Sequence, residues 1–232
     1  MKRKSFFGKC WMWTKRIFII LFIAQLAYII LLKWVNPPVT VTQLTNWIGG
    51  NGLQRDYVRS NQISINAKLA FIASEDQVFP DHNGFDFKSI KKAMKHNKKS
   101  KSLHGASTIS QQTAKNVFLW QGRSWIRKGL EVYFTFMIEL IWGKKRILEV
   151  YLNVVETGKG VFGIEAAANK YFNKSAKNIT RNEAAMIAAC LPNPKRFTVK
   201  PLSGRVASRS VWIAQQMNNL DTDPDVQDLI KK

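Results

Sequence analysis

An uninterrupted apolar run near the N-terminus constrains this chain more than any other feature. Residues 17–32 carry no charged side chain, and with Trp34 and Val35 the run reaches the length of about 17–25 residues that crosses a bilayer. Six basic residues and no acid precede it in residues 1–16, which favours a cytoplasmic N-terminus. We therefore expect a single-pass protein of the inner (cytoplasmic) membrane, with its remaining residues periplasmic or otherwise extracytoplasmic.

A cleaved signal peptide is the competing interpretation of this run. Its apolar part exceeds the usual core of about 7–15 residues, and no A-x-A-like cleavage site follows it, so we favour the uncleaved anchor. The two cysteines agree with an exported domain that has no disulfide. Cys10 precedes the span and Cys190 follows it, so they face opposite sides of the membrane, and Cys190 is expected in the core.

Helical periodicity dominates the rest of the chain, and strand-like alternation is nearly absent. Asp86 is expected to cap a helix with Phe87 and Met94 on one side, and Ser107 to cap the next helix. The sequence predicts a mostly α fold. Its predicted divisions are a basic cytoplasmic tail (1–16), a transmembrane helix (17–35), a linker or membrane-proximal segment (36–61), one domain (62–220) and a tail (221–232).

Charge is distributed unevenly along this domain. The whole chain has 36 Lys+Arg against 15 Asp+Glu, a formal charge of +21, which indicates an anionic partner. Residues 73–86 nevertheless hold four carboxylates and a histidine, whereas residues 87–130 hold eleven Lys or Arg and no acid. An acidic cluster is therefore followed by a long cationic tract.

Glu75 is the leading candidate for chemistry in the acidic cluster. It ends a helix whose preceding residues are largely apolar, so desolvation is expected to raise its pKa toward the working range of a general base. An ordinary surface acid is the competing interpretation. Further on, Arg127 and Glu131 stand four residues apart on one helical face, and the apolar surroundings of Glu131 predict a buried, partnered carboxylate.

Aromatic residues are interleaved with the cations of this second region, a pattern that suits single-stranded nucleic acid or a lipid interface. The membrane anchor favours lipid, so we expect no nucleic-acid partner. The glycines at 158, 160 and 163 match G-x-G-x-x-G without a βαβ pattern around them, which argues against a nucleotide cofactor. The three histidines and two cysteines lack metal-ligand spacing, so zinc is not expected.

Six motifs in order resemble one known family. They are E-D-Q-V-F-P-D-H-N-G (75–84), G-A-S-T-I-S-Q-Q-T-A-K-N (105–116), R-K-G-L-E (127–131), K-K-R-I-L-E-V-Y-L-N (144–153), G-I-E-A-A-A-N-K-Y-F (163–172) and E-A-A-M-I-A-A-C-L-P-N-P (183–194). This order over about 120 residues is similar to that of the peptidoglycan glycosyltransferases of family 51. Ala106 and Ser110 replace a common Gly and Thr, and neither exchange removes a catalytic group.

The resemblance implies a lysozyme-like α-helical domain with a small membrane-facing subdomain, and the monofunctional biosynthetic type of enzyme. The implied substrates are lipid II and the growing glycan chain, beside membrane lipid. The implied reaction joins C1 of a donor MurNAc to the 4-hydroxyl of an acceptor GlcNAc with inversion, and releases undecaprenyl pyrophosphate. The span also offers a surface to cell-division or wall-synthesis proteins.

The resemblance also implies roles for particular residues. Glu75 matches the general base, and Glu131 matches a second acid that positions cations or a divalent metal, Mg or Mn, near the phosphates. Lys115 and Arg123 match donor-pyrophosphate ligands. The other implied substrate-site residues are Asp76, Phe79, His82, Ser107, Gln111, Gln112, Arg127 and Lys128, of which the first three shape the loop around the base.

Two other functions remain as alternatives. A lytic muramidase-type enzyme would act on the same polymer, but it needs a protonated acid at the glycosidic oxygen and has no use for a pyrophosphate site. A membrane-anchored scaffold without catalysis leaves the pattern from Glu75 to Glu131 without a purpose. The cationic tract favours synthesis, because negative charge develops on a departing pyrophosphate.

Overall fold

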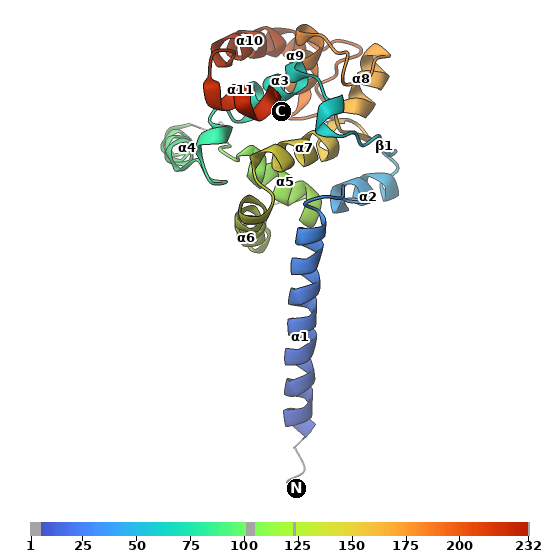
Figure 1. The fold of residues 1–232 in the computed structure, drawn as a ribbon, viewed down its shortest axis with the longest axis vertical. Helices are drawn as coiled ribbons and strands as arrows, with labels where there is room; N and C mark the ends of the chain where they lie inside the picture. The colour runs from blue at the N-terminus through green and yellow to red at the C-terminus, as the bar shows by residue number, and fades with distance from the viewer. Residues whose placement is uncertain (1–5, 101–104, 123, 232) are drawn as a thin grey trace. The chain divides into compact units, whose positions relative to one another are not determined.

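The structure is a computed structural model that describes residues 6–100, 105–122 and 124–231, and it divides into two compact units (Figure 1). The first unit, Met1–Asn36, contains helix α1 (Phe6–Leu31). At about 1.5 Å per residue, its 26 residues exceed the hydrocarbon thickness of about 30 Å. By length and composition α1 therefore suits a single membrane span, and it also includes part of the predicted basic tail.

The second unit, Pro37–Lys232, contains the remaining described elements. Its first half comprises α2 (Val41–Ile48), β1 (Gln54–Arg55), the 3₁₀ turn η1 (Ser60–Gln62), α3 (Ile65–Glu75), the 3₁₀ turn η2 (Phe79–Asp81), α4 (Phe87–Lys99) and α5 (Ile109–Phe118). Its second half comprises α6 (Trp125–Ile141), α7 (Lys144–Val154), β2 (Glu156–Gly158), β3 (Val161–Phe162), α8 (Ile164–Phe172), α9 (Arg181–Cys190), α10 (Gly204–Leu220) and α11 (Pro224–Lys231). The predicted mostly α fold is confirmed.

The core forms around α3, which packs against α9 and α10. Residues 67–73 of α3 are all buried, so this helix is enclosed on every side rather than along one stripe. Cys190, at the end of α9, is buried and unpaired, as expected. A second layer is made by α5, which packs between α6 and α7. Glu75 ends the central helix α3 and therefore emerges at the edge of the core.

A small sheet in the order β1-β3-β2 completes the domain, with β1 parallel and β2 antiparallel to β3. Its strands are two or three residues long, too short to show a period of two in the sequence. Because β1 pairs with β3, and α2 packs against α5, residues 41–55 are part of the folded domain and not the predicted linker.

The predicted C-terminal tail also differs from the structure. Residues 224–231 form α11, which buries Val226, Leu229 and Ile230 against the domain. Asp223 caps this helix, since its Oδ1 accepts hydrogen bonds from the backbone of Asp225 and Val226, each at 3.0 Å. The apolar positions at i, i+3 and i+4 are a helical signal that the acidic character of the segment obscured.

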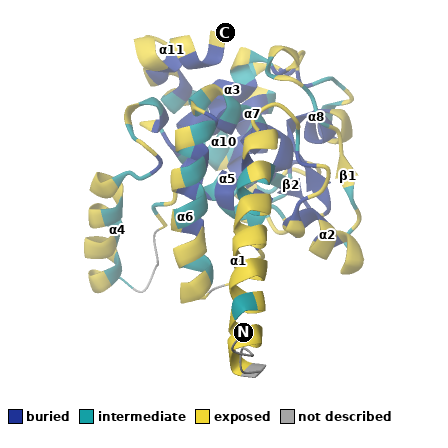
Figure 2. Cartoon of the chain, turned by 60° about the horizontal axis from the view of Figure 1, so that its bottom comes forward, coloured by how far each residue is buried: buried dark blue, intermediate teal, exposed yellow. Residues whose placement is uncertain are grey.

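The structure also tests the predicted N-terminal caps of α4 and α5. Asp86 caps α4 as predicted, but α4 contributes no buried residue, and Phe87 and Met94 are exposed (Figure 2). Thr108, not Ser107, caps α5, so the prediction for Ser107 is wrong by one residue. Thr108 is preferred because Gln111 stands three residues after it and completes a capping box.

Candidate active site

Glu75 lies where α3 leaves the core, with part of its surface open to solvent. Burial raises the pKa of its carboxyl above the ordinary 4.5, and hydrogen bonds from Gln112 and Ser74 oppose that rise. Gln112 Nε2 donates to Glu75 Oε2 at 2.9 Å, and Ser74 Oγ donates to Oε1 at 3.1 Å. The carboxylate is therefore held in one orientation and weakly solvated, which suits a general base.

Tyr151 fixes the orientation of Gln112. Its hydroxyl donates to Gln112 Oε1 at 3.0 Å, so the amide must present its NH₂ group to Glu75. Tyr151 is buried on α7, and its ring meets that of Phe71 edge-on at 6.1 Å between centroids. Three elements, α3, α5 and α7, thus contribute to the orientation of one carboxylate.

Asp76 holds the loop that follows the base. Its carboxylate lies 3.0 Å from His82 Nε2 and accepts a hydrogen bond from the backbone of Ile109, the first residue of α5, also at 3.0 Å. An anion at a helix N-terminus is electrostatically favourable. The backbone N–H of Gly84 donates to His82 Nδ1 at 3.1 Å, which places the imidazole proton on Nε2 facing Asp76.

Gly84 is required by the close packing of this loop. Its φ is +87°, and a Cβ there would lie 2.8 Å from Thr135 Cγ2. Its carbonyl accepts a hydrogen bond from Thr108 Oγ1 at 2.7 Å. Phe79 is fully buried in the same loop. Asp76 and His82 therefore hold this loop in place, and Phe79, which was expected at the substrate site, presents no surface to a substrate.

Two predicted substrate-site residues at the start of α5, Ser107 and Gln111, lie in different surroundings. Gln111 is buried and accepts from the backbone of Thr108 at 3.1 Å in the capping box, so it stabilises the helix start instead of lining an open cleft. Ser107, just before the cap, is exposed. Gln112, one residue further along the helix, turns toward Glu75.

A compact cationic cluster is centred on Glu131 of α6. Glu131 is 3% exposed, and Arg127 donates to its Oε2 at 2.6 Å while Lys128 donates to its Oε1. The predicted buried and partnered carboxylate is confirmed. Arg127 Nε is buried, and among the described residues it has no hydrogen-bond partner.

Lys115 connects the cluster to the base. Its ammonium interacts electrostatically with Glu131, Arg127 and Lys128 and also with Glu75, and burial lowers its pKa. Lys115 lies on α5 one helical turn after Gln112, so both side chains lie on the same side of that helix. The structure thus brings the base and three of the predicted cations into one site.

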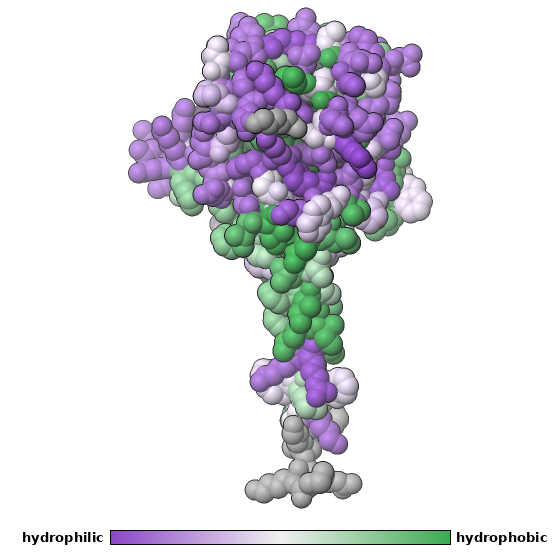
Figure 3. All heavy atoms as spheres, viewed as in Figure 1, coloured by the Kyte–Doolittle hydropathy of each residue, from purple (hydrophilic) through white to green (hydrophobic). Residues whose placement is uncertain are grey.

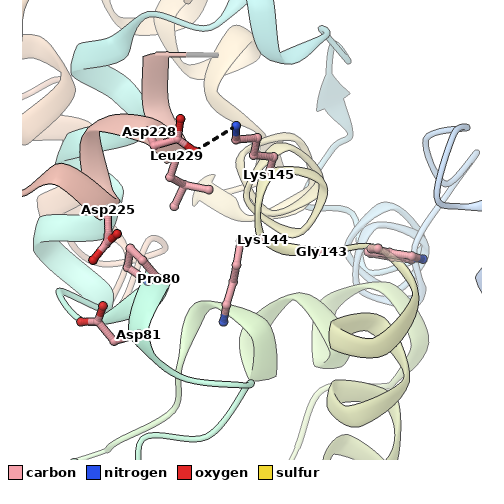
Figure 4. Close-up of a pocket in the computed structure, with 9 residues that line it drawn as sticks. Pro80, Asp81, Gly143, Lys144, Lys145, Asp225, Asp228 and Leu229 are labelled. Carbon is pink, nitrogen blue, oxygen red and sulfur yellow. Dashed lines mark hydrogen bonds and ion pairs between the residues drawn. The ribbon is translucent and has the colours of Figure 1, made fainter.

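A separate cavity of about 590 Å³ lies between η2, the start of α7 and α11 (Figure 4). Its charged lining residues are Asp81, Asp225 and Asp228 on one side and Lys144 and Lys145 on the other. Lys145 and Asp228 form an ion pair at 3.4 Å. None of the predicted site residues lines this cavity, so it is not the candidate active site.

Comparison with known proteins identifies the family of this chain. The transglycosylase family model matches residues 41–218. The chain belongs to the transglycosylase family. The biosynthetic peptidoglycan transglycosylases of Shigella boydii serotype 4 (strain Sb227) and Escherichia coli (strain K12 / DH10B) are each 56% identical to it over 189 residues, which cover 80% of this chain and 78% of the relative.

Among the sites expected in this transglycosylase, a metal at Glu131 does not fit the side chains present. Both carboxylate oxygens of Glu131 are taken by Arg127 and Lys128, and cations surround it. Within the described residues, no group of three acid, histidine or cysteine side chains is placed to hold a metal ion. Mg²⁺ would need oxygen ligands free of competing cations, so we derive no step through a metal.

Two residues near Glu75 were not singled out from the sequence, and one predicted residue lies outside the residues that the structure describes. Tyr151 belongs to the fourth motif, but nothing in the sequence indicates its hydrogen bond to Gln112. Arg209 of α10 interacts electrostatically with Glu75, and its guanidinium lies 3.8 Å from the centre of the Trp212 ring. Arg123, a predicted pyrophosphate ligand, lies outside the described residues.

Proposed function

We propose that this transglycosylase polymerises lipid II into glycan strands by inverting glycosyl transfer and releases undecaprenyl pyrophosphate. The observation that carries the proposal is the arrangement of α5, which bears Gln112, bonded to the candidate base Glu75, and Lys115 one turn later, and which packs against α6 with its cationic cluster. Glycosyl transfer from a pyrophosphate needs both functions side by side. One takes a proton from the acceptor, and the other stabilises the leaving group.

Glu75 acts on the acceptor in this proposal. Its carboxylate takes the proton of the 4-hydroxyl of GlcNAc as the oxygen attacks C1 of the donor MurNAc, and the C1–O bond to the pyrophosphate breaks on the opposite face. Gln112 and Ser74 fix the carboxylate for this transfer. Glu75 must be ionised to act, and its raised pKa makes it a stronger base than an exposed glutamate.

Lys115, Arg127 and Lys128 stabilise the departing pyrophosphate. The buried Nε–H of Arg127 has no acceptor among the described residues, and a phosphate oxygen would satisfy it. Glu131 pairs with Arg127 and Lys128 and also attracts Lys115, which keeps three like charges together before substrate arrives. Because it acts on the substrate only through these cations, Glu131, which belongs to the third motif, is a positioning residue in this proposal.

A lipid-linked substrate agrees with the outer face of α6. This helix turns Glu131, Thr135 and Ile138 inward and exposes a run of apolar residues, namely Trp125, Ile126, Leu130, Val132, Phe136 and Leu140. Figure 3 shows hydrophobic side chains gathered over this part of the domain. An exposed apolar face of this size suits contact with lipid. One helix, α6, can therefore bind the pyrophosphate of a substrate through its cationic cluster and the lipid tail through its apolar face.

The first experiment is incubation of the detergent-solubilised full chain with labelled lipid II, followed by product separation with and without muramidase digestion. We expect muramidase-sensitive polymer from the natural chain and none from Glu75→Gln. The folded-state pKa of Glu75 is raised, so its ionisation at neutral pH opposes folding. Glu75→Gln should therefore melt at the same temperature as the natural chain or higher.

Two outcomes would contradict the proposal. Full polymerisation by Glu75→Gln would remove Glu75 as the base. Cleavage of preformed glycan without any polymer from lipid II would instead make the chain a lytic enzyme and leave the cationic cluster without its proposed role.

A further inference from the structure

Helix α2 has its polarity inverted relative to a helix on the surface of a water-soluble domain. Its polar residues Thr42, Gln43 and Asn46 are 3%, 0% and 5% exposed. Its large apolar residues Leu44, Trp47 and Ile48 are 40%, 61% and 74% exposed. A helix beside water normally turns its apolar stripe toward the core, so some other surroundings must favour this orientation.

Specific hydrogen bonds hold the polar face inward. Gln43 Nε2 donates to the hydroxyl of Tyr57 at 2.9 Å, and Gln121 Nε2 donates to Thr42 Oγ1 at 2.7 Å. Asn46 Nδ2 donates to the Thr42 carbonyl at 3.0 Å. Rotating α2 to hide its apolar face would break the first two of these bonds. The outward direction of Leu44, Trp47 and Ile48 is therefore built into the domain.

We infer that α2 lies in the interface of the lipid bilayer, with Leu44, Trp47 and Ile48 inserted at the boundary between headgroups and acyl chains. Only residues 32–40 separate the end of α1 from the start of α2. Nine residues reach at most about 30 Å. If α1 crosses the membrane, chain connectivity alone keeps α2 within that distance of the end of the span.

Composition favours lipid as the occupant of this face. No Asp or Glu occurs in residues 1–55, so nothing in or before α2 repels an anionic lipid surface. Tryptophan is enriched at membrane interfaces, where its ring meets both the apolar and the hydrated layers. A short helix with one strongly apolar face lies in the plane of the interface rather than across it.

This position has a consequence for the proposed site. The bond from Gln121 to Thr42 ties α2 to the segment just before α6, and α2 packs against α5, which carries Lys115. A lipid-bound α2 would therefore hold the cationic cluster at the level of the headgroups, where the pyrophosphate of a lipid-linked donor lies. This last step rests on the proposed function, whereas the location of α2 does not.

The location is tested by measuring the depth of a spin label in the full chain. Cys10 is replaced by Ser, the label is attached at Ile48→Cys, and the protein is placed in vesicles of phosphatidylethanolamine and phosphatidylglycerol. Cys190 is buried and does not compete for the label. The matched control carries the label at Ser208→Cys, an exposed site on α10. Collision rates with oxygen, which enters lipid, and with a water-soluble nickel chelate are compared.

We expect the label at position 48 to collide several-fold more with oxygen than with nickel, and the label at position 208 to show the reverse. Equal behaviour of the two labels would place α2 in water and overturn the inference. Protection of position 48 from both reagents would also overturn it, because a protein surface would then cover α2.

A second measurement uses activity. The double substitution Trp47→Gln with Ile48→Gln should slow polymerisation of lipid II in vesicles several-fold and leave the rate in detergent unchanged. The control, Leu202→Gln with Val211→Gln, alters two residues that are 54% and 60% exposed elsewhere. Equal rates for both variants in vesicles would contradict the inference. If the natural chain itself does not polymerise lipid II, the proposed function fails while the label depth still decides the position of α2.

Discussion

For individual residues, the hydrogen bond from Gln112 to Glu75 has a directly measurable role. This bond stabilises the charged carboxylate and opposes the pKa rise that burial causes. Gln112→Ala should therefore raise the pKa of Glu75 further. Hydrogen bonds to charged groups are stronger than those between neutral groups, so we expect this rise to be visible in the pH dependence of activity.

The measurement is kcat/KM on lipid II as a function of pH. Activity requires ionised Glu75, so it falls as pH falls through the raised pKa, and in Gln112→Ala that fall should begin at higher pH. Tyr151→Phe frees the Gln112 amide and should shift the profile less, in the same direction. If the fall of kcat/KM at low pH begins at the same pH in Gln112→Ala, that fall does not report the titration of Glu75.

Lys115 should affect catalysis far more than folding. Lys115→Ala removes a partly desolvated cation from the proposed leaving-group site, and loss of one such stabilising group costs about 10²–10³ in kcat. Lys88→Ala, an exposed site on α4, is the matched control and should retain full activity. The assay is the initial polymerisation rate, with melting temperature measured in parallel. A fall in melting temperature that matches the loss of activity would make Lys115 a structural residue instead.

Among the elements, α11 is a stabilising part of the domain. Ile230 is 1% exposed, and its carbonyl accepts a hydrogen bond from the buried Lys68 at 3.1 Å. Ile230→Ala should lower the free energy of unfolding by about 2–5 kcal/mol, the usual cost of such a truncation. Denaturant unfolding measures this, with Lys231→Ala, an exposed neighbour, as the control. Equal stability of the two variants would mean that α11 does not stabilise the domain.

For the whole molecule, the domain should fold without its anchor. Residues 37–232 form a compact unit with their own core. A fragment of these residues should keep the melting temperature of the full chain within a few degrees. Its polymerisation rate on lipid II in vesicles should fall at least tenfold, because tethering raises the effective concentration at the membrane. Circular dichroism melting and the vesicle assay test the two parts, and a fragment that is unfolded at room temperature would refute the first.

Local patterns allowed much of this protein to be predicted from its sequence. The apolar run of α1, the helical periods of α3 to α10 and the capping box of Thr180 and Glu183 depend on neighbours within a few residues. The acidic segment with Glu75 and the cationic residues of α5 and α6 were visible for the same reason. The errors occurred where the signal was short or ambiguous, at α2, β1, α11 and the first residue of α5.

The sequence by itself determined the class of fold, the membrane-suited helix and the residue types at the candidate site, because these follow from composition and spacing along the chain. Only the tertiary structure decided which of those residues meet. It turned Gln112 toward Glu75, placed Gln111 in a cap and buried Phe79. Contacts between α3, α5, α6 and α7 depend on how separate helices pack, and that geometry leaves no periodic trace in the sequence of any one of them.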